Sequence, residues 1–413
     1  MFIDIRRAHW TARIERLVYV RLPADVCGGD QCGRLNKAMY GCRDAAQCWE
    51  AEITDFFTSI GFTPGIGSPV LFVNLTRNIR VTIHGDDITS LGTEENLLWL
   101  KQQLETRYEL KFGGLLGPDR GDVKDAMILN RLVHFDVDET TYESDPRHVQ
   151  ILLSVLNLKD AKSVVSPGVS RKDEETELLD AATISRFRSL VMRANYLALD
   201  RPDIAYAAKE LARRMSAPTV DDWAGLKRLV RYLKGRPRLV WFYKQQEDPG
   251  EFCMFSDSDD GGCSKTRKST SSGVLMHGAH LIKAYSSTQH IIAMSSGESE
   301  FYAGVCAGAS LIGARSMAED LGCTRSGILL FDANAAKSML TRRGFGRAKH
   351  IHRSYLWLQQ RINEKDIRLQ KVGTKVNPSD LGTKFLEGVR IQELLQIMSL
   401  RYEDVEHRMT LHV

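Results

Sequence analysis

The spacing of hydrophobic residues in the first third of the chain alternates between strand-like and helical patterns. Residues 1–24 predict a strand, a polar turn and a second strand, and residues 34–60 carry apolar side chains at helical spacing, which predicts one long helix or two. Residues 70–91 predict two strands and a turn, and residues 93–110 predict an amphipathic helix with a capping-type start. This order favours an α+β layer with helices on one face of a sheet.

The remaining two thirds of the chain predict a helical block followed by a second mixed unit. Residues 160–182 and 245–250 are rich in Pro, Gly, Ser and charge, which is typical of linkers, and they enclose a helical block at 183–237. Beyond the second linker the pattern predicts three strands, after which helices alternate with single strands. The expected helices lie at 296–321 and 349–364, and the expected strands lie at 327–332 and 366–372.

Composition limits the class of protein only coarsely. The 413 residues are 43% hydrophobic and 26% charged, which is ordinary for a globular chain of about two to four domains. The net charge of +4 permits a nucleic-acid partner without requiring one. No long apolar run and no apolar signal segment occurs, which predicts a cytoplasmic or nuclear protein without a membrane span. The cysteines show no CxxC pair, which favours free thiols over a zinc site.

The stretch "IRVTIHGDDITSLG", residues 79–92, places the carboxylates of Asp86 and Asp87 side by side. One interpretation is a tight type I′ hairpin turn, because Gly and Asp both tolerate positive φ. The other is a metal site, because two carboxylates on a hairpin tip can hold a hard divalent cation such as Mg²⁺. The short motif alone leaves both interpretations open.

Four acids in the last third of the chain lie where a structural role is harder to assign. Asp257 lies inside a strand, Glu300 lies at a helix start among small residues, Asp332 ends an apolar strand, and Asp380 begins the segment "SDLGTK". An acid on an apolar background costs desolvation energy unless it is paired or bound to a metal. Asp332 and Asp380 could instead cap helices. The four acids together, on this order of elements, favour a metal site.

This block resembles the ribonuclease H domain of copia-type retrotransposon Pol proteins. The similarity is carried by "FSDSDDGG", "SSGESEFYAGV", "LLFDANAAKSML", "KHIHRSYLWLQQRI" and "VNPSDLGTK". It implies that Asp257, Glu300, Asp332 and Asp380 bind a pair of Mg²⁺ ions, with Mn²⁺ as an alternative, and hydrolyse RNA in RNA–DNA hybrids. Glu298 is a rival for Glu300, but the Glu-Phe/Tyr-x-Ala context favours Glu300.

The first third of the chain resembles the reverse transcriptase of the same elements. The segments "FIDIRRAHW", "LVYVRLP", "LNKAMYGCRDAAQCW" and "VTIHGDDITSLG" carry this similarity. It implies that Asp4 and Asp86 hold a further metal pair, with Asp87 close by, for attack of a primer 3′-hydroxyl on a deoxynucleotide. The resemblance also implies a nucleotide and template pocket that includes His9, Gly41 and Arg43.

The resemblance spans about residues 2–386 and implies a fold class and partners. We expect an α+β fold in which a reverse transcriptase palm-like domain is followed by a helical connection and a ribonuclease H-like α/β domain with a mixed five-stranded sheet. The implied partners are an RNA template, a DNA primer, an RNA–DNA hybrid and deoxynucleotides, with no membrane. The expected domains are a palm with missing fingers at 1–142, a thumb remnant and linker at 143–180, a connection at 181–248, ribonuclease H at 249–386 and a tail at 387–413.

Two runs of basic residues predict contacts with nucleic-acid phosphates. One lies on the helix expected at 223–238 and the other lies between 342 and 353. The alternative for each run is a solvated helix face. The residues expected to bind nucleic acid are Lys227, Arg228, Arg231, Lys234, Arg342, Arg343, Arg347, Lys349 and His350.

Several features depart from the family pattern. The fingers, which lie upstream in the family and grip the nucleotide triphosphate, are expected to be missing, so polymerase activity is expected to be impaired more than ribonuclease H activity. Asp44 replaces a Gln in the pocket segment and would repel phosphates unless it faces away. Two alternative functions are an RNA-dependent RNA polymerase, which the GDD motif suits, and a non-catalytic nucleic-acid-binding remnant.

Overall fold

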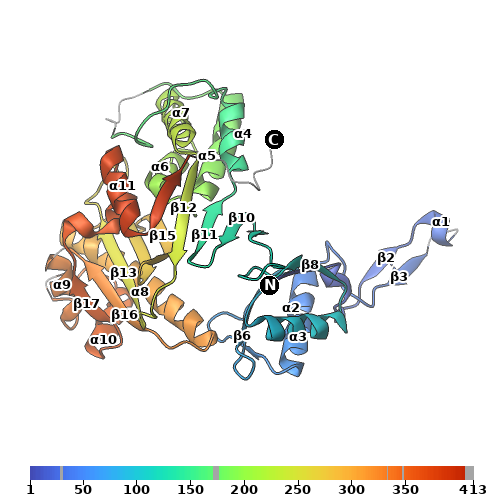
Figure 1. The fold of residues 1–413 in the computed structure, drawn as a ribbon. Coiled ribbons are helices and arrows are strands. Elements are labelled where there is room, and N and C mark those ends of the chain that lie inside the picture. Colours follow the sequence, from blue (N-terminus) through green and yellow to red (C-terminus); the bar gives the residue numbers. More distant parts are fainter. Residues whose placement is uncertain (28–30, 171–175, 333, 347, 405–413) are drawn as a thin grey trace. The chain divides into compact units, whose positions relative to one another are not determined.

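The computed structural model describes residues 1–27, 31–170, 176–332, 334–346 and 348–404 (Figure 1). It divides into two compact units. Unit 1 comprises Met1–Val123 with Ser316–Thr324, and unit 2 comprises Lys124–Arg315 with Arg325–Val413. The two units are described separately.

Unit 1 is built on a six-stranded antiparallel sheet in the order β4-β5-β6-β7-β1-β8. Helices α2 (Ala45–Ser59) and α3 (Glu94–Glu105) share one hydrophobic core with the sheet, as the α+β pattern predicted. Residues alternate between buried and exposed along β6, so one face of the sheet supplies the core. The strands are β1 (Phe2–Ile5), β4 (Thr63–Pro64), β5 (Leu71–Asn74), β6 (Ile79–His84), β7 (Asp87–Leu91) and β8 (Leu110–Gly114).

The helix expected over residues 34–60 is shorter than predicted. Residues 35–44 are not helical, and α2 begins at Ala45 after Asp44 in the N-cap position. Gly41 has φ +90°, which a helix does not accommodate, and Met39 is 37% exposed although its spacing matches the apolar stripe. Before this segment lie the short helices η1 (Ala8–Trp10) and α1 (Ala24–Cys27) and a hairpin of β2 (Tyr19–Arg21) and β3 (Cys32–Arg34).

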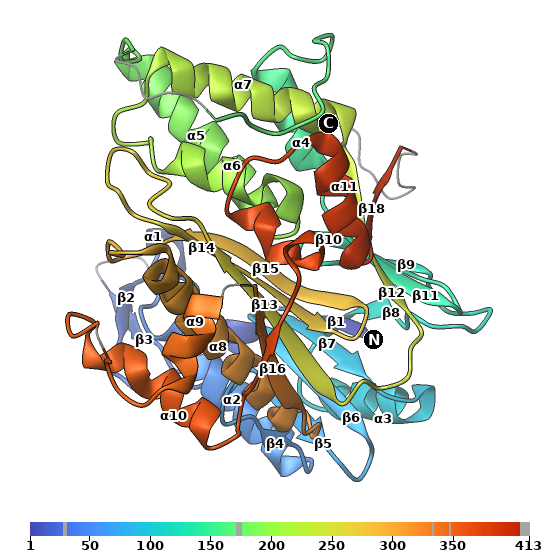
Figure 2. The same ribbon diagram turned by 90° about the vertical axis from the view of Figure 1, so that its left-hand side faces the viewer.

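The helical block predicted at 183–237 is present in unit 2 as three helices that share a core with a fourth (Figure 2). Local capping explains where two of them begin. The Asp180 carboxylate accepts bonds from the amides of Ala182 and Thr183, and Thr219 forms a capping box with Asp222. The helices are α4 (Arg147–Val155), α5 (Ala181–Leu197), α6 (Pro202–Ala212) and α7 (Val220–Gly235).

Unit 2 also contains the predicted mixed five-stranded sheet, in the order β15-β14-β13-β16-β17. The three-stranded meander is antiparallel, whereas β16 runs parallel to both β13 and β17. The strands are β13 (Glu251–Ser258), β14 (Thr270–His277), β15 (His280–Thr288), β16 (Ser326–Phe331) and β17 (Arg368–Lys371). Between and after them come α8 (Ser296–Asp320), α9 (Asn334–Thr341), η2 (Arg353–Leu356), α10 (Trp357–Asn363), η3 (Thr374–Val376) and η4 (Pro378–Gly382).

A second five-stranded sheet, which the sequence pattern did not predict, has the order β18-β12-β11-β10-β9 and is antiparallel. Its strands are β9 (Asp125–Ile128), β10 (Arg131–Phe135), β11 (Glu139–Ser144), β12 (Arg238–Lys244) and β18 (Leu400–Glu403), and α11 (Gly388–Ile397) precedes the last. These strands come from the segments assigned to palm, thumb, connection and tail. The domain boundaries therefore stay a prediction.

Two expectations from composition can be compared with the structure. All eight cysteines are free thiols, as their spacing suggested. Within the residues that the structure describes, no helix combines the length and the apolar character needed to cross a bilayer.

Candidate carboxylate sites

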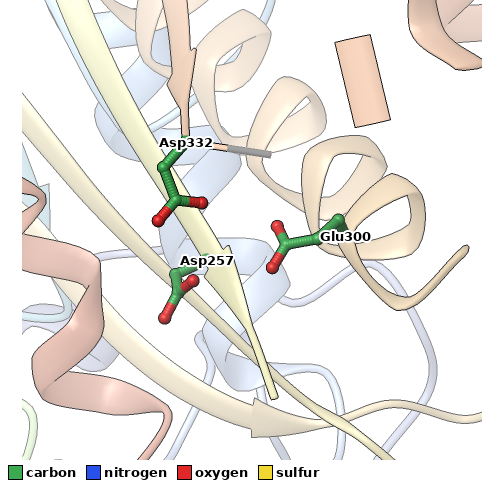
Figure 3. A group of neighbouring side chains, drawn as sticks. All are labelled: Asp257, Glu300 and Asp332. Carbon is green, nitrogen blue, oxygen red and sulfur yellow. The ribbon is translucent and has the colours of Figure 1, made fainter. Parts of the chain in front are cut away.

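Three carboxylates from different elements meet at one edge of the mixed sheet (Figure 3). Asp257 lies near the end of β13, Asp332 follows β16, and Glu300 lies near the start of α8. One oxygen of each carboxylate lies within 4.8 Å of the others. The sheet explains part of this arrangement, because β13 and β16 are parallel neighbours and both acids stand at the same end of their strands.

The start of α8, which carries Glu300, packs closely against α9 because a glycine lies at the contact. A Cβ on Gly297 would lie 2.9 Å from the Cβ of Ala335 in α9, so glycine is needed for this approach. Glu300 is 9% exposed and Asp257 is 5% exposed. Two of the three acids are therefore largely removed from water, whereas Asp332 is half-buried.

Burial and repulsion from neighbouring acids make Asp257 and Glu300 hard to ionise. Burial, with the charges of Asp380 and Asp332, raises the pKa of Asp257 to about 7, although a hydrogen bond from Thr383 opposes the shift. Burial and the charge of Asp257 raise the pKa of Glu300 to about 8. Clustered carboxylates in such a site need either protons or a cation to neutralise them.

The oxygen atoms of the cluster suit a hard divalent cation. Glu300 Oε1 accepts a bond of 3.1 Å from the Ser258 amide, while Glu300 Oε2 is buried and has no protein hydrogen-bond partner. Such a buried oxygen is costly unless a ligand or water completes it. Carboxylate oxygens are the ligands that Mg²⁺ prefers, so the residues present fit the ion that the sequence implied.

Asp380, the fourth predicted ligand, is not part of this close group among the described residues. It lies in η4, where Lys384 Nζ contacts its Oδ1 at 2.6 Å and Arg390 Nη2 lies 3.7 Å from its Oδ2. The structure therefore brings three predicted acids together and places the fourth against two basic side chains.

Glu298, the rival to Glu300, has a different environment. Its carboxylate is 3% exposed and accepts hydrogen bonds from Tyr302 Oη at 2.8 Å and from the Met294 amide at 3.2 Å. The same carboxylate contacts His350 Nε2 at 2.8 Å. Glu298 is thus occupied by protein contacts, and His350, which was expected to bind nucleic acid, contacts this acid.

The Asp86–Asp87 motif forms the tip of the β6–β7 hairpin in unit 1. The strand register pairs Asp4 of β1 with Asp87 of β7, and the Ile5 amide donates to the Asp86 carbonyl at 2.9 Å. Burial and the charges of Asp86 and Asp4 raise the pKa of Asp87. The register thus places Asp87, and not the predicted partner Asp86, opposite Asp4, and among the described residues these acids do not form a close group like that of Asp257, Glu300 and Asp332.

The turn geometry corrects the type I′ interpretation. Gly85 has φ +63°, whereas Asp86 is not among the described residues with positive φ. Positive φ at only the first turn residue is the type II′ pattern, which requires Gly at that position. The Trp49 indole donates to the Gly85 carbonyl at 2.7 Å and so holds the tip against α2.

The predicted pocket residues of unit 1 lie around an aromatic contact. The rings of His9 and Tyr40 are 4.6 Å apart, and His9 Nδ1 is buried without a hydrogen-bond partner. Gly41 and Arg43 are exposed. Asp44, which was expected to repel phosphates, is paired with Arg16 at 2.9 Å, and its hydrogen bond with Arg16 lowers the pKa of Asp44.

The basic face of α7 binds the linker of its own chain. Arg228 donates to Ser166 Oγ at 2.9 Å. Arg231 donates to the Lys162 carbonyl at 2.6 Å, and Lys234 donates to the Ala161 carbonyl at 2.7 Å. These contacts favour a structural role for this face, whereas Lys227 is exposed. The residues that hold the linker are Arg228, Arg231 and Lys234.

The second basic run lies before η2. Arg343 and Lys349 are exposed, and Arg342 is half-buried. Arg347 lies outside the described residues. A phosphate-binding role for this run stays a prediction.

Sequence reasoning missed two hydroxyl groups that orient the acids. Thr383 Oγ1 donates to Asp257 Oδ2 at 2.6 Å, and Thr374 Oγ1 donates to Asp332 Oδ2 at 2.9 Å. Thr383 lies three residues after the predicted ligand Asp380 in the same motif, so its closeness in sequence was an available signal. The pairing of Thr374 with Asp332 depends on long-range packing and had no local signal.

Comparisons with known proteins find similar sequences over most of the chain. Residues 1–117 match the family described as "Reverse transcriptase (RNA-dependent DNA polymerase)". The chain is 28% identical over 406 residues to the retrovirus-related Pol polyprotein from transposon RE2 of Arabidopsis thaliana. This alignment covers 94% of this chain and 27% of that protein. It is 24% identical over 400 residues to the corresponding polyprotein from transposon TNT 1-94 of Nicotiana tabacum, covering 92% of this chain and 29% of that protein.

A solved structure shows the same fold. The foamy viral protease-reverse transcriptase in complex with RNA/DNA hybrid matches 90% of this chain and 44% of that chain, with a TM-score of 0.53 and 11% sequence identity. This confirms the predicted α+β fold of the reverse transcriptase and ribonuclease H type. The chain spans less than a third of the length of the two Pol polyproteins that it matches. The chain is thus similar over most of its length to the Pol polyproteins of transposons RE2 and TNT 1-94, and its first 117 residues match the reverse transcriptase family.

Proposed function

We propose that unit 2 cleaves the RNA strand of RNA–DNA hybrids in a Mg²⁺-dependent reaction. The observation that carries this proposal is the group formed by Asp257, Glu300 and Asp332, whose oxygens converge within 4.8 Å on a mixed five-stranded sheet. The relationship to Pol polyproteins and the likeness to a fold that was solved with an RNA/DNA hybrid support the choice of substrate.

In this proposal each residue has a defined task. Asp257, Glu300 and Asp332 hold the cation, with Asp380 as the fourth acid of the site. When bound, a pair of Mg²⁺ ions supplies activation of a water and stabilisation of the leaving oxygen. Thr383 orients Asp257 through its 2.6 Å bond, and the Ser258 amide orients Glu300 through its 3.1 Å bond.

The decisive test compares two acids that stand two positions apart on α8. Glu300→Gln removes a charge from the carboxylate group and is expected to reduce cleavage of a labelled RNA strand in a hybrid by about 10³-fold, as loss of a charged metal ligand does. Glu298→Gln keeps acceptors for Tyr302 and His350 and is expected to change the rate by less than about threefold. Equal losses in the two variants contradict the assignment of Glu300.

We also propose RNA-directed DNA synthesis at the acids of unit 1. The register that pairs Asp4 with Asp87, and the match of residues 1–117 to the reverse transcriptase family, favour this second activity. Asp4 and Asp86 would hold the cation, with Asp87 beside them on the hairpin, and the substrates would be a primed RNA template and deoxynucleotides.

Asp86→Asn is expected to reduce primer extension on an RNA template by about 10³-fold while hybrid cleavage stays unchanged, because its carboxylate belongs to the other group of acids. The assay measures extension of a labelled DNA primer by the full chain with deoxynucleotides. Incorporation of ribonucleotides in their place would identify an RNA-dependent RNA polymerase. Hybrid binding without extension or cleavage would identify a non-catalytic remnant.

A further inference from the structure

The fourth acid of the ribonuclease-type site is neutralised from within the chain. Lys384, four residues after Asp380, places its Nζ 2.6 Å from Asp380 Oδ1, and Arg390 Nη2 lies 3.7 Å from Asp380 Oδ2. Asp380 is buried, with its side chain 5% exposed. A buried carboxylate of this kind requires a positive partner, and here the partner is a side chain of the protein.

The Lys384 ammonium also lies in the field of the other acids. Burial disfavours its charged form, but the hydrogen bond to Asp380 and the charges of Asp380, Asp257 and Asp332 together raise the pKa of Lys384. In turn, the charge of Lys384 opposes the rise in the pKa of Asp257. The direct contact of 2.6 Å between Lys384 Nζ and Asp380 Oδ1 places this positive charge at the fourth acid.

The two basic side chains differ in how firmly they are held. Arg390 also donates to Glu393 Oε2 at 3.0 Å and to the Thr374 carbonyl at 3.2 Å. The Lys384 side chain is 50% exposed and ends in a flexible stem. The pair is therefore buried at the Asp380 carboxylate but open to solvent along the Lys384 side chain, so Lys384 can move to another anion provided that a cation replaces it at Asp380.

We propose that Lys384 is a built-in counter-ion that keeps Asp380 from binding a divalent cation until a nucleic-acid phosphate draws the ammonium away. This inference rests on the ribonuclease function proposed above. In the free protein the group of Asp257, Glu300 and Asp332 then holds its cation alone. Arrival of the substrate backbone supplies an anion for Lys384 and frees Asp380, which couples assembly of the complete site to binding of the hybrid.

The test counts Mn²⁺ bound to the full chain without nucleic acid, from the electron paramagnetic resonance signal of free Mn²⁺. All proteins carry Asp86→Asn and Asp87→Asn, so that the hairpin of unit 1 loses its charged ligands. Lys384→Met is expected to bind one further Mn²⁺, with an affinity about tenfold above that of the parent for this ion, because an opposing charge is removed. Lys384→Arg keeps the positive charge and is expected to match the parent.

The matched control is Lys101→Met, because Lys101 pairs with Glu105 over the same four-residue spacing and at the same 2.6 Å in unit 1. It is expected to leave the Mn²⁺ count unchanged. Adding Asp380→Asn to Lys384→Met is expected to remove the extra ion. Circular dichroism melting of each variant establishes that the count refers to folded protein.

Two failures are distinguishable. If Asp257→Asn loses no Mn²⁺, the carboxylate group does not bind the cation, and both the proposed function and this inference fall. If Asp257→Asn loses an ion while Lys384→Met gains none and binds no more tightly, only the role of Lys384 is overturned.

Discussion

Asp257→Asn is expected to abolish cleavage of the RNA strand in an RNA–DNA hybrid, with a loss of about 10³-fold or more. Asn keeps the size of the side chain and an oxygen that can accept the 2.6 Å bond from Thr383. It removes the negative charge from the member of the group that lies in β13. The measurement is the initial rate of cleavage by the full chain with Mg²⁺, compared with wild type.

The chain supplies a matched control within three residues. Asp260 is exposed and belongs to the same acidic run, but it does not belong to the carboxylate group. Asp260→Asn is expected to change the rate by less than about twofold. Melting in EDTA tests folding, and Asp257→Asn is expected to melt no lower than wild type, because it removes a buried charge that neighbouring acids repel. Cleavage by Asp257→Asn at the wild-type rate would contradict the proposed site.

Local sequence signals predicted those elements whose causes are local. The apolar runs of the last third predicted the strands observed as β13 and β16. The caps at Asp180 and Thr219, which start α5 and α7, were local signals that the prediction of one block at 183–237 did not use. Asp257 and Asp332 lie at one edge because β13 and β16 are parallel neighbours, a pairing that the order of elements alone did not predict. Parallel neighbours necessarily bring such residues together.

Composition could not decide between Glu298 and Glu300, but helix geometry separates them. Residues two apart on a helix point to different faces, and here one carboxylate faces Asp257 while the other accepts bonds from Tyr302 and Met294. The family-like context favoured Glu300, which is the acid that lies beside Asp257 and Asp332. The physical reason lies in packing that a linear pattern does not contain.

The features that sequence patterns missed depend on long-range contacts. The pairing of β18 with β12 joins Leu400 to Trp241, and a four-residue strand near the end of the chain carries no sign of its partner. The apolar spacing of residues 35–44 suggested a helix, but Gly41 and the exposed Met39 do not belong to one. The ion pair between Lys384 and Asp380 depends on side-chain geometry, which the sequence of the motif does not determine.

Asp203→Asn is expected to destabilise unit 2 by about 3–5 kcal/mol, the usual cost of breaking a fully buried ion pair. The Arg201 and Asp203 side chains are both 0% exposed and form two bonds, of 2.9 and 2.7 Å. Arg201 also donates to the carbonyls of Arg236 and Pro237, and Tyr232 donates to Asp203. The pair thus ties the start of α6 to the end of α7, and the variant leaves a buried guanidinium without its charge partner.

Hydrogen–deuterium exchange of the α6 and β12 amides measures the loss in free energy of unfolding of unit 2, independently of unfolding in unit 1. The exposed pair of Lys101 and Glu105 is the control, and Glu105→Gln is expected to cost less than about 0.5 kcal/mol. The double variant Arg201→Met with Asp203→Leu is expected to recover at least about half of the loss, because apolar groups can replace a buried pair. A loss below about 1 kcal/mol in Asp203→Asn would show that water or a shifted neighbour compensates the guanidinium.

The same variant separates stability from chemistry. Neither Arg201 nor Asp203 is a member of the carboxylate group, so the cleavage rate per folded molecule of Asp203→Asn is expected to stay within about twofold of wild type at a temperature where the protein is folded. Asp257→Asn is expected to give the opposite result, with activity lost and folding kept. If Asp203→Asn instead loses cleavage without losing stability, the polar network between α6 and α7 positions the site. The assignment of stability to the Arg201–Asp203 pair and of chemistry to the carboxylate group is then wrong.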